Sequence, residues 1–259
     1  MTWLRRTLLT ALPKVLLSRT TGVLARTPLP RSLRATVYGA FARRYGVDLR
    51  EMDGELRGFR SLAEFFQRPL RDGARPIAGA ALVVACDGRI VTSGAIEGGR
   101  IPQVKGVDYG LGDLLGDAAR AARIDGGSQQ TIYLAPGDYH RVHCPFDATI
   151  TAIRALKGTL FPVNPKAVRA VPGLFVRNAR VVFDADLADG RSGAIAMVGA
   201  FNVGDVHRSC AAGARLRRGD ELGRFGFGST VVCVVGPGGP GFVGLPPETV
   251  VRTGAGAVG

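Results

Sequence analysis

The sequence has few of the residues that build metal centres or disulfide frameworks. It contains three histidines and four cysteines, and the cysteines stand far apart, at Cys86, Cys144, Cys210 and Cys233. No C-x-x-C pair occurs, which argues against a structural zinc site or a dense set of disulfides. This usage of cysteine is typical of a protein in a reducing compartment.

Long apolar runs are also missing. The N-terminal apolar residues, among them Trp3 and Leu12, recur at helical spacing but are interrupted by Arg5 and Lys14. Such a segment is too short and too broken to cross a bilayer. A signal peptide is the competing interpretation, but Pro13 interrupts the run and no small-x-small cleavage site follows closely. We therefore predict an amphipathic helix on a membrane surface, with a helix packed on the protein's own core as the alternative.

Acidic residues are absent from the first 47 positions, although the chain carries a formal charge of +13. A basic segment of this kind favours a polyanion, either nucleic acid or the anionic face of a membrane. Aromatic residues do not alternate along the strands as base-stacking requires, so the membrane is favoured. The basic residues are Arg5, Arg6, Lys14, Arg19, Arg26, Arg31, Arg34, Arg43 and Arg44.

The residue pattern changes once along the chain, from helical periodicity to short β-branched runs. Helical patterning covers 32–45, and a capping box from Ser61 to Glu64 predicts a short helix over 61–66. A linker with Pro69, Gly73 and Pro76 follows, and we place a boundary near residue 75. The prediction is therefore an N-terminal helical, membrane-surface segment over 1–75 and a β-rich catalytic domain over 76–259.

Short β-branched runs separated by glycine and proline dominate beyond the linker. They predict strands at 81–85, 88–94, 131–134, 141–143, 149–154, 180–183, 193–203 and 231–235, and a helix at 108–122 crosses them. The expected fold class is α+β, with a β-rich core of short, mainly antiparallel strands.

Three sites carry residues with catalytic chemistry. Two of the three histidines, His140 and His143, stand in Asp138-Tyr-His-Arg-Val-His143. A zinc site is one interpretation, although the helical zinc-protease motif would need a glutamate that H-x-x-H lacks. Asp87-Gly88 marks a turn, and Gly228-Ser229-Thr230 joins a glycine-rich turn to an apolar strand. Ser229 is either a turn cap or a nucleophile.

A series of motifs resembles the pyruvoyl-dependent bacterial phosphatidylserine decarboxylase proenzymes in order and spacing. Three differences from the family pattern are Phe227 before Gly-Ser-Thr, Ala85-Cys86 before the aspartate, and a tract between Val203 and Gly219 that is short compared with some family members. The matching pieces are Leu12-Pro-Lys14, Phe65-Phe-Gln-Arg-Pro-Leu-Arg71, Arg75-Pro76, Asp87-Gly88, Lys105-Gly106-x-x-Tyr109, Tyr133-Leu-x-Pro136, Asp138-Tyr-His-Arg-x-His143, Leu160-Phe-x-Val-Asn164, Asn178-x-Arg-Val181, Val198-Gly199-Ala200, Gly223-Arg-Phe225 and Gly228-Ser229-Thr230.

The resemblance implies that Ser229 attacks the carbonyl of Gly228, with His143 as its base and Asp87 as the group that orients the base. Elimination and hydrolysis would release ammonia and leave a pyruvoyl group at position 229. This autocatalytic cleavage would divide the zymogen into a β chain, 1–228, and an α chain, 229–259.

The implied reaction is the decarboxylation of phosphatidylserine to phosphatidylethanolamine and CO2, a lyase step in phospholipid biosynthesis. The covalent pyruvoyl cofactor would form a Schiff base with the substrate amine and accept its electrons. His140 is then the expected proton donor, and Phe161 and Asn164 border the headgroup pocket unless they serve packing alone. No metal is expected.

The expected partners are phosphatidylserine in an anionic membrane and the α and β chains themselves, which form a heterodimer from one precursor. Further dimerisation is left open, and no nucleic acid is expected. The expected location is peripheral, on the cytoplasmic side of the cell membrane.

Other functions fit the residues less well. A serine hydrolase needs glycines two positions before and after its nucleophile, where Phe227 and Val231 stand here. A lipoyl or biotin carrier needs a lysine at a hairpin tip, and no lysine follows Lys166. A zinc-dependent hydrolase built on His140 and His143 is the remaining alternative.

Overall fold

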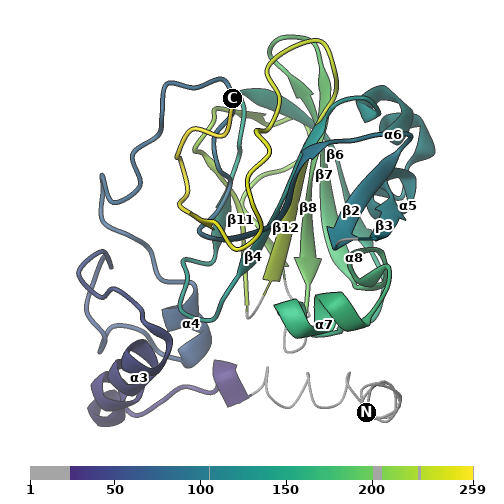
Figure 1. The fold of residues 1–259 in the computed structure, drawn as a ribbon. Helices are drawn as coiled ribbons and strands as arrows, with labels where there is room; N and C mark the ends of the chain where they lie inside the picture. The colour runs from purple at the N-terminus through teal and green to yellow at the C-terminus, as the bar shows by residue number, and fades with distance from the viewer. Residues whose placement is uncertain (1–23, 105, 201–205, 227–228, 259) are drawn as a thin grey trace.

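An eight-stranded antiparallel sheet forms the centre of the protein in the computed structural model, which describes residues 24–104, 106–200, 206–226 and 229–258 (Figure 1). The amphipathic segment predicted near the N-terminus and Gly228 of the predicted cleavage site lie outside the described residues. In sheet order the strands are β10 (Arg215–Leu216), β6 (Ala148–Leu156), β7 (Arg180–Leu187), β8 (Ser192–Gly199), β12 (Ser229–Val235), β4 (Ser128–Leu134), β1 (Gly88–Ala95) and β13 (Val250–Val251).

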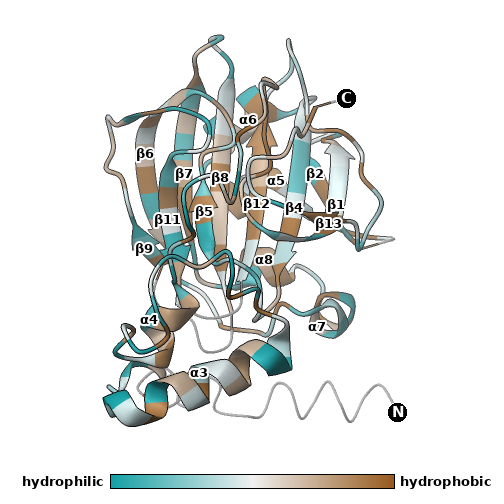
Figure 2. Ribbon diagram, turned by 90° about the vertical axis from the view of Figure 1, so that its left-hand side faces the viewer, coloured by the Kyte–Doolittle hydropathy of each residue, from teal (hydrophilic) through white to brown (hydrophobic). Residues whose placement is uncertain are grey.

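Strand β12 is the most deeply buried part of this sheet. It pairs along its full length with β4 on one side and with β8 on the other, and all seven of its residues are buried. A strand covered on both faces is expected to be continuously apolar and β-branched, as the valines of β12 are. Figure 2 shows this hydrophobic strand in the middle of the sheet.

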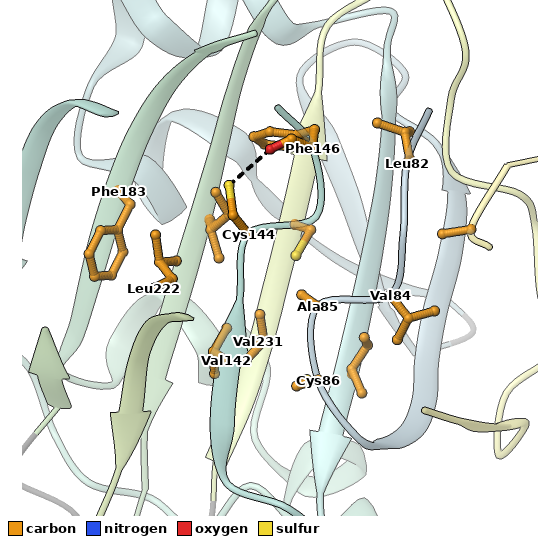
Figure 3. Close-up of a cluster of buried hydrophobic side chains, with 14 of the residues drawn as sticks. Leu82, Val84, Ala85, Cys86, Val142, Cys144, Phe146, Phe183, Leu222 and Val231 are labelled. Atoms are coloured by element: carbon orange, nitrogen blue, oxygen red, sulfur yellow. Dashed lines mark hydrogen bonds between the residues drawn. The ribbon is translucent and has the colours of Figure 1, made fainter. Parts of the chain in front are cut away.

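One face of the sheet packs against a second, three-stranded sheet in the order β5 (Arg141–His143), β11 (Glu221–Phe225) and β9 (Val206–Arg208). Val142 and Leu222 from this sheet meet Val231 of β12 in one apolar cluster (Figure 3). The segment 82–86 also packs there. We predicted a strand at 81–85, which is wrong: only a single bridge, between Val83 and Gly256, forms. The segment's apolar run reflects burial under the sheet rather than membership of it.

The opposite face is covered by helices and a hairpin. Its apolar cluster includes Val232 and Val234 of β12. The covering elements are β2 (Arg100–Val104), β3 (Val107–Gly110), α5 (Leu111–Leu115), α6 (Ala118–Ile124), α7 (Pro165–Ala170) and α8 (Leu174–Arg177).

The single helix predicted over 108–122 is therefore wrong. Residues 107–110 pair with β2, and the helical part is divided at Gly116 and Asp117. Gly116 has a φ of 65°, in the left-handed region, and ends α5. Asp117 caps α6 by accepting a hydrogen bond from the backbone N–H of Arg120. Gly116 is thus a helix-ending signal and Asp117 a helix-starting signal, and the apolar periodicity alone shows neither.

The N-terminal helices α3 (Arg31–Tyr45) and α4 (Leu62–Phe66) confirm both predicted helices, and Ser61 caps α4 as the capping box indicates. They enclose a small core of their own, in which the rings of Tyr38 and Phe65 stack with centroids 5.0 Å apart. Figure 1 shows the pair beyond one end of the large sheet. In the described ranges, no helix is long and apolar enough to span a membrane.

The predicted fold class is confirmed: the protein is α+β and antiparallel strands dominate it. The strand predicted over 193–203 ends at Gly199, and residues 201–205 are not described. The other predicted strands correspond to β1, β4, β5, β6, β7 and β12, within a few residues at their ends.

Gly88 provides a test of how tightly β1 and β4 pack. Its φ is 155°, and a Cβ there would lie 2.3 Å from the carbonyl oxygen of Tyr133. We expect Gly88→Ala to cost about 2 kcal/mol or more, because both backbone strain and overpacking are introduced. At about 2–4 °C per kcal/mol, thermal unfolding should show a clear drop in Tm.

Gly94 on the same strand is the matched control. Its φ is 140°, but a Cβ there would meet nothing within 4 Å. Gly94→Ala should therefore lower Tm less than Gly88→Ala does. Equal Tm values for the two variants would contradict the close packing at Gly88.

Candidate active site

The strand register places Ser229, Asp87 and the loop that carries His140 at one end of the large sheet. Ser229, the first residue of β12, lies opposite Leu134 at the end of β4 and Gly199 at the end of β8. Strand β1 begins at the same end, because Arg89 pairs with Tyr133. Asp87 precedes β1 and the loop 135–140 follows β4, so both lie at this end of the sheet, the lower end in Figure 1.

Ser229 is buried, and its hydroxyl has no hydrogen-bond partner within the structure. Because side chains alternate along a strand, Ser229 lies on the same face as Val231, beneath the sheet that contains β5 and β11. Thr230 lies on the opposite face with Val232, and its hydroxyl is likewise unpartnered. The hydroxyl groups of these two neighbouring residues therefore lie on opposite faces of the sheet.

His140 is fully buried and has one free ring nitrogen. Its Nδ1 lies 2.8 Å from the carbonyl oxygen of Asp138, while Nε2 has no hydrogen-bond partner in the part of the chain that the structure describes. The ring packs against Phe66 of α4 with centroids 3.9 Å apart. Burial lowers the pKa of His140 to about 3, so the imidazole is neutral. A carbonyl oxygen can only accept a hydrogen bond, so Nδ1 carries the proton of the neutral ring and Nε2 carries the lone pair.

His143 stands on β5 with both ring nitrogens engaged. Nδ1 lies 2.7 Å from the carbonyl oxygen of Gly219, and Nε2 lies 3.1 Å from the Tyr139 hydroxyl. Burial lowers the pKa of His143, while the Gly219 carbonyl opposes that shift. The ring is thus held at both ends.

Asp87 is held by neighbours other than a histidine. Both carboxylate oxygens accept hydrogen bonds from Arg75, and Oδ1 also accepts the backbone N–H and the hydroxyl of Thr253. Arg75 in turn bonds to Glu51, which also pairs with Arg252. Among the described residues, no hydrogen bond joins Asp87 to His143, although the two are near enough for the carboxylate to raise the pKa of the imidazole.

The two residues predicted to border a headgroup pocket lie on the other side of the sheet from Ser229. Phe161 is buried, and the Arg177 guanidinium stands over its ring, 4.8 Å from the centroid. Asn164 is exposed and caps α7, where its Oδ1 accepts the backbone N–H of Ala167 at 3.0 Å. Asn164 therefore has a structural role that sequence reasoning did not assign.

Asn178 connects Phe161 to the strand beside Ser229. Its amide group donates to the carbonyl oxygens of Phe161 and Gly199, at 2.8 and 2.9 Å, and its Oδ1 accepts the N–H of Phe161. Gly199 is the register partner of Ser229. A buried asparagine with its polar atoms so fully used fixes the position of the segment around Phe161 relative to the end of β12.

Sequence reasoning assigned no role to Arg75, Tyr139, Asn178 or Thr253. The first three lie inside motifs that the sequence displays, so their positions carried a signal, but no spacing rule shows which atoms they contact. Thr253 stands outside every motif. His207, the third histidine of the chain, is exposed on β9.

The geometry bears on the histidine-pair zinc interpretation. Within the described ranges, no group of three or more His, Cys, Asp or Glu side chains is arranged to hold a metal ion. A metal at His143 would have to displace either the Gly219 carbonyl or the Tyr139 hydroxyl.

Comparisons with known proteins match most of the chain. The sequence profile of the family described as phosphatidylserine decarboxylase matches residues 62–256. A phosphatidylserine decarboxylase proenzyme from Anaeromyxobacter sp. (strain K) is 45% identical over 251 residues, covering 88% of this chain and 87% of that protein. Proteins of the same name are 38% identical in Myxococcus xanthus, over 89% of this chain and 88% of theirs, and 41% identical in Pseudomonas aeruginosa PAO1, over 87% and 86%. The chain therefore belongs to the phosphatidylserine decarboxylase family.

Proposed function

We propose that this chain is a proenzyme that cuts itself between Gly228 and Ser229 and then decarboxylates phosphatidylserine to phosphatidylethanolamine and CO2. The observation that carries the proposal is the state of Ser229. Its hydroxyl is buried and has no hydrogen-bond partner among the described residues, at the sheet end where Asp87 and the loop that carries His140 also lie. A hydroxyl in that state is available as a nucleophile when a base approaches it.

The self-cleavage step uses His143 as the base. Its neutral ring can accept the Ser229 proton as the oxygen bonds to the Gly228 carbonyl carbon. The C–N bond then breaks, the imidazolium returns the proton to the departing nitrogen of residue 229, and an ester remains. Asp87 acts on His143 through its charge, since a nearby carboxylate stabilises the imidazolium that forms. Arg75 and Thr253 hold the carboxylate in place for this purpose.

The environment of Ser229 fits the serine-derived pyruvoyl group of this family. The side chain is fully buried on the face of β12 that carries Val231, and its hydroxyl has no hydrogen-bond partner among the described residues that would have to be given up first. The pyruvoyl group supplies the electron sink for decarboxylation, which no ordinary side chain provides.

His140 is the proposed proton donor in decarboxylation. Burial keeps it neutral in the uncut chain, but an anionic substrate group beside it would raise its pKa and load Nε2 with a proton. The unpartnered Nε2 is the atom that this role requires. Phe161 and Asn164 are proposed to border the headgroup, with the exposed Arg177 beside Phe161 as a cation for its phosphate.

The membrane-surface segment is proposed to extend over residues 1–75, with the catalytic domain over 76–259. Support comes from α3 and the residues before it, where Leu24, Leu33 and Val37 are 72%, 51% and 38% exposed between arginines. Exposed apolar side chains interleaved with basic ones suit the interface of an anionic bilayer. All four cysteines are free, which agrees with a position on the cytoplasmic side.

Self-cleavage should be visible by mass. Purified protein should consist of chains 1–228 and 229–259, and Ser229→Ala should remain a single chain, because the nucleophile is gone. Denaturing mass spectrometry measures both.

Hydride reduction with phosphatidylserine present should attach the lipid to chain 229–259 and abolish CO2 release. An intact chain with full activity would overturn the proposal, and activity lost to a chelator and restored by zinc would favour the histidine-pair hydrolase.

The two histidines should separate the two reactions. His143→Ala should leave the precursor uncut, because Ser229 loses its base, whereas His140→Ala should still cut but release CO2 at least 100-fold more slowly. Gel analysis and a labelled-substrate assay read the two steps. His207→Ala, on an exposed strand, is the control for losing a histidine. The reverse pattern would exchange the assigned roles.

Membrane binding should have a salt-sensitive and a salt-resistant part. Each basic residue near an anionic surface contributes about 1 kcal/mol, which salt screens, while the apolar contacts of Leu33 and Val37 persist. Sedimentation with phosphatidylglycerol vesicles should show Leu33→Asp/Val37→Asp binding weakly at high salt. Val250→Asp, at a 63% exposed site on β13, should bind as the parent does. Equal binding of both variants would place the docking face elsewhere.

A further inference from the structure

Tyr139 and His143 form a pair that none of the roles above includes. The Tyr139 hydroxyl lies 3.1 Å from Nε2 of His143, and the two rings stack with centroids 5.7 Å apart and planes 29° apart. Tyr139 is only 7% exposed. A buried phenol placed against a buried imidazole is held in one arrangement, so the direction of its hydrogen bond can be worked out.

The partner of Nδ1 fixes that direction. The Gly219 carbonyl oxygen, 2.7 Å away, has no proton to give, so Nδ1 must carry one. Burial lowers the pKa of His143, which favours the neutral ring, and a neutral ring protonated on Nδ1 has its lone pair on Nε2. Burial also raises the pKa of Tyr139 to about 12, so its hydroxyl keeps its proton. Tyr139 is therefore the donor and Nε2 the acceptor.

His140 provides the internal contrast. It has the same kind of Nδ1 contact, to the carbonyl oxygen of Asp138, but its Nε2 has no partner. The two histidines thus have the same tautomer, but only in His143 does Nε2 accept a hydrogen bond, from Tyr139.

We propose that Tyr139 is a positioning residue for His143, whose hydroxyl holds the neutral ring with its lone pair on Nε2 until the serine proton is transferred. Its consequence for self-cleavage rests on the proposed function, in which His143 is the base. Because the hydroxyl donates to the neutral ring alone, it opposes protonation of His143. The other groups that act on this ring are Glu221, opposite it on β11, together with Arg141 and Asp87.

The protonation effect can be measured without any cleavage. The chain has three histidines, so the full-length Ser229→Ala protein labelled with ¹⁵N-histidine gives a simple NMR spectrum, and His143→Gln assigns the relevant signal. Adding Tyr139→Phe should raise the pKa of His143 by about half a unit to one unit, as the loss of one hydrogen bond predicts. Tyr109→Phe, which removes another buried phenol from the cluster on the other face, should leave it unchanged. An unchanged His143 titration in Tyr139→Phe would overturn the proposal.

A second measurement connects the pair to the reaction. Precursor made by cell-free synthesis is transferred to buffers of different pH, and the rate of self-cleavage is followed on gels. His143 acts as a base only when neutral, so the rate falls as pH drops through its pKa, and Tyr139→Phe should move that fall to higher pH by the shift seen in NMR. An NMR shift without a matching change in the rate profile would leave Tyr139 as the partner of His143 but remove His143 from its proposed role as base.

Discussion

The burial of β12 between β4 and β8 is the constraint on which the rest of the structure depends. All seven residues of β12 are buried, and the strand is hydrogen-bonded to β4 along one edge and to β8 along the other. The position of Ser229 is therefore fixed by backbone hydrogen bonds on two sides. The same register fixes the ends of β4 and β8, and with the end of β4 the loop that carries His140 and leads into β5. A site built at the end of such a strand needs few side-chain contacts to hold its backbone in place.

The N-terminal helices are part of the site rather than an appendage to it. Phe66 of α4 packs on His140, and Arg68 donates to the carbonyl oxygens of Gly137 and Asp138 in the histidine loop. The burial that keeps His140 neutral therefore comes partly from a unit whose proposed task is to meet the membrane. The unit proposed to meet the bilayer and the histidine proposed as the proton donor are therefore in direct contact.

How far the sequence predicted this arrangement depends on the kind of interaction. Strands such as β5 and β12 and the helix capped by Ser61 were predictable, because alternation, β-branching and capping are local signals. The helix predicted over 108–122 failed because Gly116 and Asp117 end one helix and begin another within an unbroken apolar pattern.

The site shows the same division. The family motifs pointed to Ser229, His140, His143 and Asp87; Ser229, Asp87 and the loop that carries His140 lie at one end of the large sheet, and His143 follows that loop on β5. Their hydrogen bonds were not predictable, because the contact of Arg75 and Thr253 with Asp87 joins segments that are remote in sequence. The expectation that Asp87 orients His143 remains a proposal, in which its charge rather than a hydrogen bond acts.

The place of β12 has a consequence for the life of the protein after the proposed cut. The smaller fragment would supply the middle strand of the sheet and, through Thr253 and the bridge of Gly256 to Val83, part of the cover of Asp87 and its neighbours. Its dissociation would separate β8 from β4 and leave both as unpaired edge strands. Alone, the fragment would be a short valine-rich peptide prone to aggregate. Folding must then precede cleavage. The cut protein would keep its native state because unfolding is slow, and the two chains would not refold once they had separated.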